Sequence, residues 1–383
     1  MVFKTSLRPG RTLMTELVLN ATASATPLAL YLTAQDSASG LTPYFGVLTA
    51  HHFDAPERET DALLRGAAVH DLGWLRRVAV RGEDRFRWLS GMVTNGVEAL
   101  TDGSGAYNLV LNAQGRIQGD AYVWRSGGNP EIETTAEQLE PLLTHLDHFI
   151  IMDDVELVSL RDQIALGITG PATDRILTGL GLSPLNEVLS LAYGTVGDIP
   201  IRIERRYGTV VPHYALWANV EQIPALWQAI VNAGATPAGS AALETLRILE
   251  GVPAYGIDIQ SRDLAQETNQ MRALNFTKGC YLGQEIVERI RSRGQVHRHL
   301  RSVELIPEDG ATVPPTGTEL RVALDDAKPA GSLTSVVALQ LNGTTRIFAI
   351  GMIRAEAEVS GRPLVYAGGK ALILNTPPKF AAA

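Results

Sequence analysis

The sequence predicts an α+β protein with several domains and a small β-barrel at its C-terminal end. Helical and strand patterns alternate without the strict repeat of βαβ units. After residues 293–294 the pattern changes to strands separated by Pro, Gly and Asp clusters. The 383 residues also exceed the roughly 250–300 that one hydrophobic core spans. We therefore expect an irregular N-terminal segment (1–58), a body with two subdomains (59–295) and a barrel (296–383).

The N-terminal segment mixes small and polar residues. Lys4, Arg8 and Arg11 precede a mildly apolar stretch, but polar residues interrupt it where a signal peptide needs a continuous apolar segment. Nowhere does the sequence hold a run of about 18 apolar residues, the length of a membrane-spanning helix. We expect a cytoplasmic start and no membrane partner.

The body contains both helical and strand patterns of apolar residues. Apolar residues recur at helical intervals in three stretches, 59–70, 86–89 and 136–149. The predicted strands are 76–82, 107–111, 121–124 and 164–168. The turn formers at 112–115 join two of these strands into a hairpin. In the barrel, strands are expected at 300–305, 320–324 and 347–353.

Composition excludes several classes of protein. Hydrophobic residues make up 45% and charged residues 19%, with a mean hydropathy of +0.04, as in an ordinary globular protein. The net charge of −8 argues against a surface devoted to nucleic acid. The single cysteine cannot form a disulfide within the chain or supply the four thiolates of an iron–sulfur cluster. These observations favour a reducing compartment and no metal site of the chain's own.

The strongest chemical signal is the string KGCYLGQE at residues 278–285. Two glycines bracket Cys280, which favours a tight loop, and a helix is expected to follow from Gln284. The helix dipole and the cations Lys278, Arg289 and Arg291 would favour a thiolate if they lay close to the sulfur. The alternative is that Cys280 packs as a small buried hydrophobe, the common fate of a free cysteine.

A basic segment follows this helix, in which five arginines and two histidines lie between residues 289 and 301. A solvated helix face is the default interpretation, and an anionic partner such as RNA is the alternative. His297 and His299 would share one face of a strand, but no third ligand stands near them, so no metal site is expected.

The string KGCYLGQE at residues 278–285 resembles the signature K-G-C-Y-x-G-Q-E of the YgfZ family, and every fixed position is present. The members of this family are folate-binding relatives of the glycine-cleavage T-protein. Further similarity lies at residues 76–95, 111–120, 243–258 and 330–335. The resemblance covers roughly residues 59–375. It implies a ring of domains around a tetrahydrofolate, or a derivative of it, and a role in the maturation of iron–sulfur enzymes. It also makes polyglutamyl folate an anionic alternative for the basic segment.

The same resemblance implies the site residues. Cys280 would be the reactive residue, and Arg247 would approach the glutamate tail of the folate, as a guanidinium binds carboxylates in a bidentate way. An ion pair with Glu244 or Glu250 is the structural alternative for Arg247. The implied cofactor-binding residues are Asn95, Asp120, Arg247, Lys278, Tyr281, Gln284 and Glu285.

Three positions depart from the T-protein pattern. Gly119 stands where T-proteins carry the first of two acids, and Asp120 is the second. The stretch 207–216 lacks the glutamate that binds the pterin in T-proteins, which leaves His213 or backbone amides for that role. Leu249 occupies a position that is usually Glu, and Glu250 follows one place later, so we discount Glu250.

Three functions remain in competition at this stage. The first is a tetrahydrofolate-binding accessory protein that uses Cys280 in assembling or repairing iron–sulfur enzymes, its suspected partners. The second is a folate-dependent aminomethyl or methyl transferase, which the missing acids disfavour. The third is a scaffold without catalysis in which Cys280 only packs.

Overall fold

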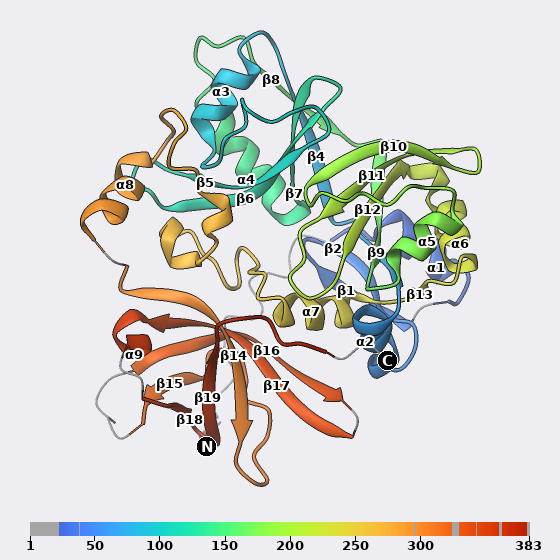
Figure 1. The fold of residues 1–383 in the computed structure, drawn as a ribbon. Coiled ribbons are helices and arrows are strands. Elements are labelled where there is room, and N and C mark those ends of the chain that lie inside the picture. The colour runs from blue at the N-terminus through green and yellow to red at the C-terminus, as the bar shows by residue number, and fades with distance from the viewer. Residues whose placement is uncertain are drawn as a thin grey trace, which may run out of the picture.

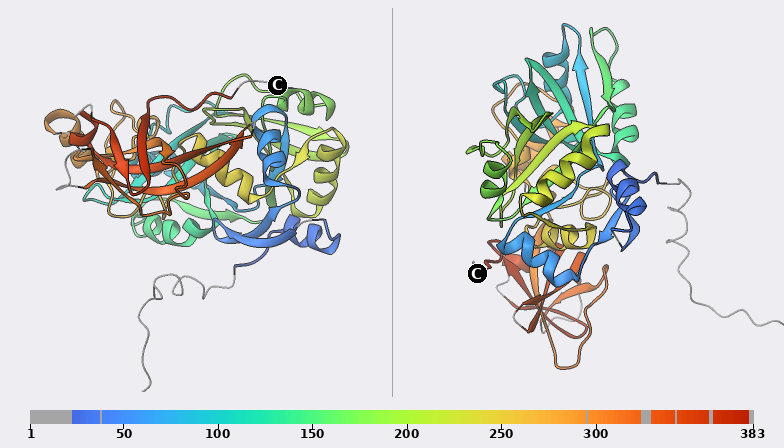
Figure 2. Two further views of the ribbon diagram at one scale, coloured as in Figure 1. Left: turned by 90° about the horizontal axis from the view of Figure 1, so that it is seen from below. Right: turned by 90° about the vertical axis from the view of Figure 1, so that its right-hand side faces the viewer.

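The computed structural model describes residues 23–37, 39–294, 296–323, 329–341, 343–359 and 362–380. Two large open sheets and one closed barrel surround the middle of the molecule, and β1 and β2 form a further two-stranded sheet (Figure 1). Views at right angles show that this arrangement is flattened (Figure 2). The predicted α+β class and the C-terminal barrel are confirmed.

The first sheet has five antiparallel strands with the order β5, β6, β7, β4 and β8. Helices α3 and α4 bury their apolar faces on it in one core that includes Val78, Trp88 and Leu142. Strands β5 and β6 form the predicted hairpin, and the side chain of Asn112 accepts hydrogen bonds from two backbone N–H groups of its turn. The bounds are β4 (Leu75–Arg81), α3 (Arg85–Met92), β5 (Gly105–Leu111), β6 (Ile117–Ser126), β7 (Asn129–Thr135), α4 (Ala136–Asp147) and β8 (Glu156–Leu160).

The second sheet has six strands in the order β10, β11, β12, β9, β3 and β13. Helices α1, α5 and α6 pack on it through a separate apolar core that includes Leu28, Ile176 and Leu226. The bounds are α1 (Pro27–Ala34), β3 (Ala68–Asp71), β9 (Gln163–Thr169), α5 (Thr173–Gly179), β10 (Ser190–Val196), β11 (Ile199–Arg206), β12 (His213–Asn219), α6 (Ile223–Asn232) and β13 (Thr236–Pro237).

The N-terminal segment differs from the prediction of an irregular stretch. Its described part holds α1, the hairpin of β1 (Ser39–Tyr44) and β2 (Val47–His52), and the start of α2 (Pro56–Arg65). Thr26 caps α1 by accepting the N–H of Ala29. Residues 1–22, and with them Lys4, Arg8 and Arg11, lie outside the described residues.

The helix predicted for 59–70 ends at Arg65 instead. Gly66 follows as its C-cap, and residues 68–71 form β3, which pairs with β9 inside the second sheet. All four residues of β3 are buried. Pairing with a distant strand therefore overrides the local helical spacing.

The first strand of the barrel begins at Arg298. Its strands close in the order β14, β17, β16, β15, β18 and β19 around a core that includes Val303, Leu333 and Ile347. The bounds are β14 (Arg298–Pro307), β15 (Glu319–Val322), β16 (Pro329–Leu341), β17 (Thr344–Arg354), α9 (Ala355–Val359), β18 (Leu364–Tyr366) and β19 (Gly369–Leu374).

Two helices connect these parts. Helix α7 (Ser240–Leu249) packs against α2, β2 and the barrel strands β16 and β17, so it joins the body to the barrel. Helix α8 (Gln284–Arg293) lies near the turn of β5 and β6 (Figure 1). Among the described residues no helix is long and apolar enough to cross a membrane.

Candidate functional site

A cavity lies where the two sheets, the β1–β2 hairpin and α7 meet. Aromatic side chains make up much of its wall, and charged or hydrogen-bonding groups stand between them. Such a combination suits a flat organic ligand whose rings stack while its edges are bound. The aromatic residues of the wall are Tyr44, Phe45, Trp74, Tyr107, Tyr122, Tyr207, Tyr214 and Tyr255.

Four side chains form a hydrogen-bonded relay on this wall. His70 Nε2 lies 2.9 Å from Thr169 Oγ1, which lies 3.2 Å from His213 Nδ1. His213 Nε2 lies 2.9 Å from Glu250 Oε1. Burial lowers the pKa of the His70 imidazole to about 3, so this end of the relay is neutral at physiological pH. We call these four residues the cavity relay.

Glu250 places a carboxylate beside the stretch 207–216, which holds no acid of its own. Its Oε1 also accepts the backbone N–H groups of Val210 and Val211, at 3.0 and 3.3 Å. Glu250 is the C-cap of α7, whereas the preceding Leu249 is buried in the core. A shift of one place turns a helical side chain by about 100°. The sequence analysis discounts Glu250 as a cavity residue, but the structure places Glu250 in the cavity wall.

Asp120 also lines the cavity, as the sequence suggested. Its carboxylate accepts the Tyr107 hydroxyl at 2.7 Å and the Gln138 amide at 2.9 Å. Burial raises the pKa of this carboxyl. The neighbouring Gly119 faces helix α4, because a Cβ added there would lie 3.1 Å from Gln138 Oε1 and 3.2 Å from Leu142 Cδ1. An acid at position 119 would therefore point away from the cavity.

Arg272, which the sequence analysis did not single out, is a cation of the same wall. Its guanidinium lies over the rings of Tyr107 and Tyr207, 4.2 and 3.8 Å from their centroids. Nη1 donates to the Tyr122 hydroxyl at 3.3 Å, and Nη2 is buried without a partner among the described residues. A buried, unused N–H group favours a ligand that brings an acceptor.

Arg247 lines the cavity, but its five N–H groups are all engaged. Nε and Nη2 donate to Glu244 at 2.8 and 2.5 Å, and Nη1 donates to Asp258 at 2.6 Å and to the carbonyl of Val252 at 2.8 Å. Nη2 also reaches Ser335 of β16 at 2.8 Å. Since a guanidinium has five N–H groups, none remains for a folate carboxylate. The structural alternative, an ion pair with Glu244, is present.

The loop of Cys280 is fixed by Lys278. The ammonium of Lys278 donates to the backbone carbonyls of Ser90, Val93 and Asn95 at 2.7, 2.7 and 2.8 Å. These carbonyls lie at and beyond the C-terminal end of α3, where cations are favourable. Burial lowers the pKa of Lys278 to about 8. Lys278 therefore holds the loop rather than lining the cavity.

The thiol of Cys280 is exposed. It does not belong to the wall of the cavity, and it makes no hydrogen bond with any described residue. Helix α8 has Gly283 as its N-cap, so Cys280 stands three residues before it and outside the turn where a helix dipole acts. The alternative of a thiol sealed in apolar packing is wrong.

The other predicted cofactor residues lie away from the cavity wall. Asn95 donates from Nδ2 to the carbonyls of Tyr107 and Arg272, and so supports two cavity residues from behind. Tyr281 is buried in the core. Gln284 and Glu285 lie in the first turn of α8. Of the seven predicted cofactor residues, Asp120 and Arg247 alone line the cavity.

Similarity to known proteins agrees with this architecture. The family model "GCVT N-terminal domain" matches residues 25–278. A chloroplastic protein of Arabidopsis thaliana named as a transferase is 26% identical over 86% of this chain and 75% of its own. An aminomethyltransferase of Anoxybacillus flavithermus is 27% identical over 66% of this chain and 72% of its own. The crystal structure of the glycine cleavage system aminomethyltransferase T of Bartonella henselae has the same fold, with a TM-score of 0.80, 18% identity and coverage of 94% and 98%.

The fold and the cavity define a multidomain protein with two large open sheets, a C-terminal barrel and an aromatic-lined cavity where the two sheets, the β1–β2 hairpin and α7 meet. The chain belongs to the GCVT N-terminal domain family, that is, to the T-protein-like, folate-related proteins.

Proposed function

We propose that the protein binds tetrahydrofolate or a derivative in the central cavity and serves as an accessory factor for iron–sulfur enzymes. The observation that carries the folate assignment is the cavity relay, which ends in Glu250 beside aromatic walls. A pteridine ring presents neighbouring N–H donors and a carbonyl on one edge. The Glu250 carboxylate suits the donors, and the unused Nη2 of Arg272 suits an acceptor. The names of the aminomethyltransferase relatives support the same ligand.

Cys280 carries the second half of this proposal. Its thiol is exposed on a fixed loop, within the complete string KGCYLGQE of the YgfZ signature. One thiol cannot hold a cluster by itself, so the cluster belongs to a client or assembly protein that meets Cys280 from outside. A reducing compartment, the cytoplasm in our proposal, keeps this thiol free.

A folate-dependent aminomethyl or methyl transferase is the second candidate, and Asp120 favours it. Bound folate would supply the carrier of the one-carbon unit. Asp120 is an acid on the cavity wall with a raised pKa, and such groups often serve in proton transfer. The glycine at position 119 does not weaken this candidate, since that position faces α4.

Titration with tetrahydrofolate and its 5-formyl and 5,10-methylene forms tests the folate assignment. Wild type should bind at least one form, and Glu250→Gln should bind it roughly ten- to a hundredfold more weakly, as loss of a charge-assisted hydrogen bond implies. Glu221→Gln, at an exposed position outside the cavity, is the matched control and should bind like wild type. Absence of binding of all three forms to wild type would overturn the proposal.

The pH dependence of binding should reveal Asp120. Burial raises the pKa of its carboxyl above the ordinary value of about 3.9, so it takes up a proton at a higher pH than an exposed carboxyl does. An ionised carboxylate accepts a stronger, charge-assisted hydrogen bond from folate than the protonated acid does. Affinity should therefore fall as the pH is lowered through the raised pKa. In Asp120→Asn this fall in affinity at low pH should be absent. If affinity depends on pH in the variant as it does in wild type, another group is responsible for the fall.

A further inference from the structure

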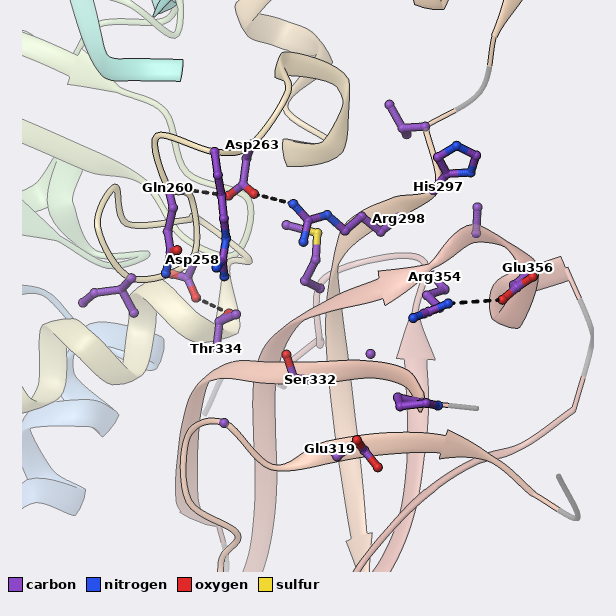
Figure 3. Close-up of a pocket in the computed structure, with 18 residues that line it drawn as sticks. Asp258, Gln260, Asp263, His297, Arg298, Glu319, Ser332, Thr334, Arg354 and Glu356 are labelled. Atoms are coloured by element: carbon purple, nitrogen blue, oxygen red, sulfur yellow. Dashed lines mark hydrogen bonds and ion pairs between the residues drawn. The ribbon is translucent and has the colours of Figure 1, made fainter. Parts of the chain in front are cut away.

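Two hollows of the molecule differ in how their polar groups are satisfied. In the large cleft between the loop 257–263 and the barrel, arginines of the chain bind the acidic side chains (Figure 3). Arg298, for example, binds Asp263 at 2.7 Å and Glu267 at 2.8 Å. The cavity relay, in contrast, ends in a polar atom without a partner: Nδ1 of His70 is buried and makes no hydrogen bond with any described residue.

The hydroxyl of Thr169 determines how the relay can be arranged. Its Oγ1 lies 2.9 Å from His70 Nε2 and 3.2 Å from His213 Nδ1. Thr169 is fully buried, and its hydroxyl has no other acceptor among the described residues. The one hydroxyl hydrogen therefore goes to one of these two nitrogens, and the oxygen accepts an N–H from the other.

In the first arrangement His213 is neutral. Glu250 Oε1, which also accepts two backbone N–H groups, accepts Nε2–H of His213 at 2.9 Å. Nδ1 of His213 then carries no hydrogen and accepts the Thr169 hydroxyl, whose oxygen accepts Nε2–H of His70. A neutral imidazole has a single N–H group, so Nδ1 of His70 is a bare acceptor.

The second arrangement contains one more proton. A proton that enters at Nδ1 of His70 displaces the Nε2 hydrogen onto Thr169, and the hydroxyl hydrogen of Thr169 passes to Nδ1 of His213. Burial lowers the pKa of the His70 imidazole to about 3, so this ring stays neutral in both arrangements. The added charge lies on His213 beside Glu250, and Nδ1 of His70 has changed from an acceptor into a donor.

The surroundings of His213 suit a ring that gains a charge. Glu250 is buried and has no Lys or Arg partner among the described residues, so its carboxylate is available to an imidazolium. Arg206, the cross-strand neighbour of His213, is itself bound by Glu133 and Glu204 at 2.6 and 3.0 Å. Its positive charge is thereby offset.

We propose that the cavity relay couples ligand recognition at His70 to one proton on His213. With His213 neutral, His70 accepts an N–H group of the ligand, and with His213 protonated, His70 donates to a carbonyl or a bare ring nitrogen. A reduced pteridine has N–H groups where fully oxidised folate has bare ring nitrogens, so the two forms favour different arrangements. This consequence for folate rests on the proposed function, whereas the two arrangements need no ligand.

NMR of the ring nitrogens tests the arrangements without a ligand, on the full chain labelled at its histidines and assigned through single histidine variants. As the pH falls from about 8 to 5, where imidazoles usually titrate, His213 should gain its second N–H. The N–H of His70 should move from Nε2 to Nδ1 at the same midpoint. Thr169→Val, which lacks the hydroxyl, should leave the His70 tautomer unchanged, whereas the control Thr169→Ser should behave like wild type.

Three results of this experiment would overturn the inference. The first is a His70 tautomer that ignores the protonation of His213 in wild type, and the second is one that still follows it in Thr169→Val. The third is a His213 that keeps one protonation state over the whole pH range.

Calorimetry in buffers of different ionisation enthalpy tests the consequence for ligands. At a pH where His213 of the free protein is neutral, folic acid should bind with uptake of close to one proton more than tetrahydrofolate, and Thr169→Val should remove this difference. Equal uptake by wild type, or folic acid that fails to bind at either end of the pH range, would overturn the selection at His70 and leave tetrahydrofolate binding intact. Absence of binding of every folate form would overturn the proposed function and leave the NMR result standing.

Discussion

Replacing Cys280 by serine is expected to abolish function in cells while leaving the protein folded. Serine has nearly the same volume but is neither a good nucleophile nor a soft ligand. Because Cys280 is exposed and makes no hydrogen bond with the described residues, its loss removes no packing. The thermal midpoint and folate affinity should therefore stay near those of wild type. The measurement is the activity of a [4Fe-4S] enzyme in a strain that lacks the endogenous protein and carries wild type or variant at matched expression.

A control on the same loop sharpens this experiment. Thr277 is also exposed, and its hydroxyl donates to Asn275, an interaction that serine can keep. Thr277→Ser should restore the enzyme activity fully, whereas Cys280→Ser should not. Full rescue by Cys280→Ser would exclude chemistry at the thiol. Loss of rescue together with a lower thermal midpoint would point to a structural role and would equally contradict the proposal.

Arg247→Ala should lower the free energy of unfolding by about 3–5 kcal/mol, the usual cost of removing one partner from a buried ion pair. Arg247 is 8% exposed, and its removal leaves Asp258, which is 2% exposed, without its cation. The variant also loses the hydrogen bond to Ser335 that ties α7 to the barrel. Urea denaturation followed by circular dichroism measures the change.

Two further variants serve as comparisons for the stability of Arg247→Ala. Arg247→Lys keeps the charge but has three donors in place of five, so it should recover only part of the loss. Arg58→Ala removes a largely exposed arginine and should change the stability by less than about 1 kcal/mol. A loss that small for Arg247→Ala would show that the buried pair contributes little. The resemblance to folate-binding relatives implies instead that Arg247 contacts the glutamate tail of the folate. That contact remains a prediction, and the engagement of all five N–H groups of Arg247 argues against it.

Local patterns predicted those elements whose spacing and turns agree with the fold. The hairpin of β5 and β6 is predictable from its turn formers, and the barrel from short strands between Pro and Gly clusters. Strand β3 was missed because its conformation depends on pairing with β9, nearly a hundred residues away. The hairpin of β1 and β2 lies in a stretch of small and polar residues that carries no clear periodicity.

The candidate site also has one part that the sequence shows and one part that only the fold assembles. The Cys280 motif is local, so the sequence shows it directly. The cavity relay joins residues of β3, β9, β12 and the end of α7, and only sheet pairing brings them together. One signal was available: Gly167 stands inside strand β9, where glycine often marks a close approach. A Cβ there would come within 1.9 Å of the His70 ring.

The anchoring of the Cys280 loop decides how a partner must reach the sulfur. Three carbonyls hold Lys278, and the backbone N–H of Leu282 donates to the carbonyl of Gly91 at 2.9 Å, so the segment is tied on both sides of the thiol. In the proposed function, such a thiol would not swing inward to deliver a group to the central cavity. It would serve as a fixed docking point, and the shape of the approaching macromolecule would set the geometry of any exchange.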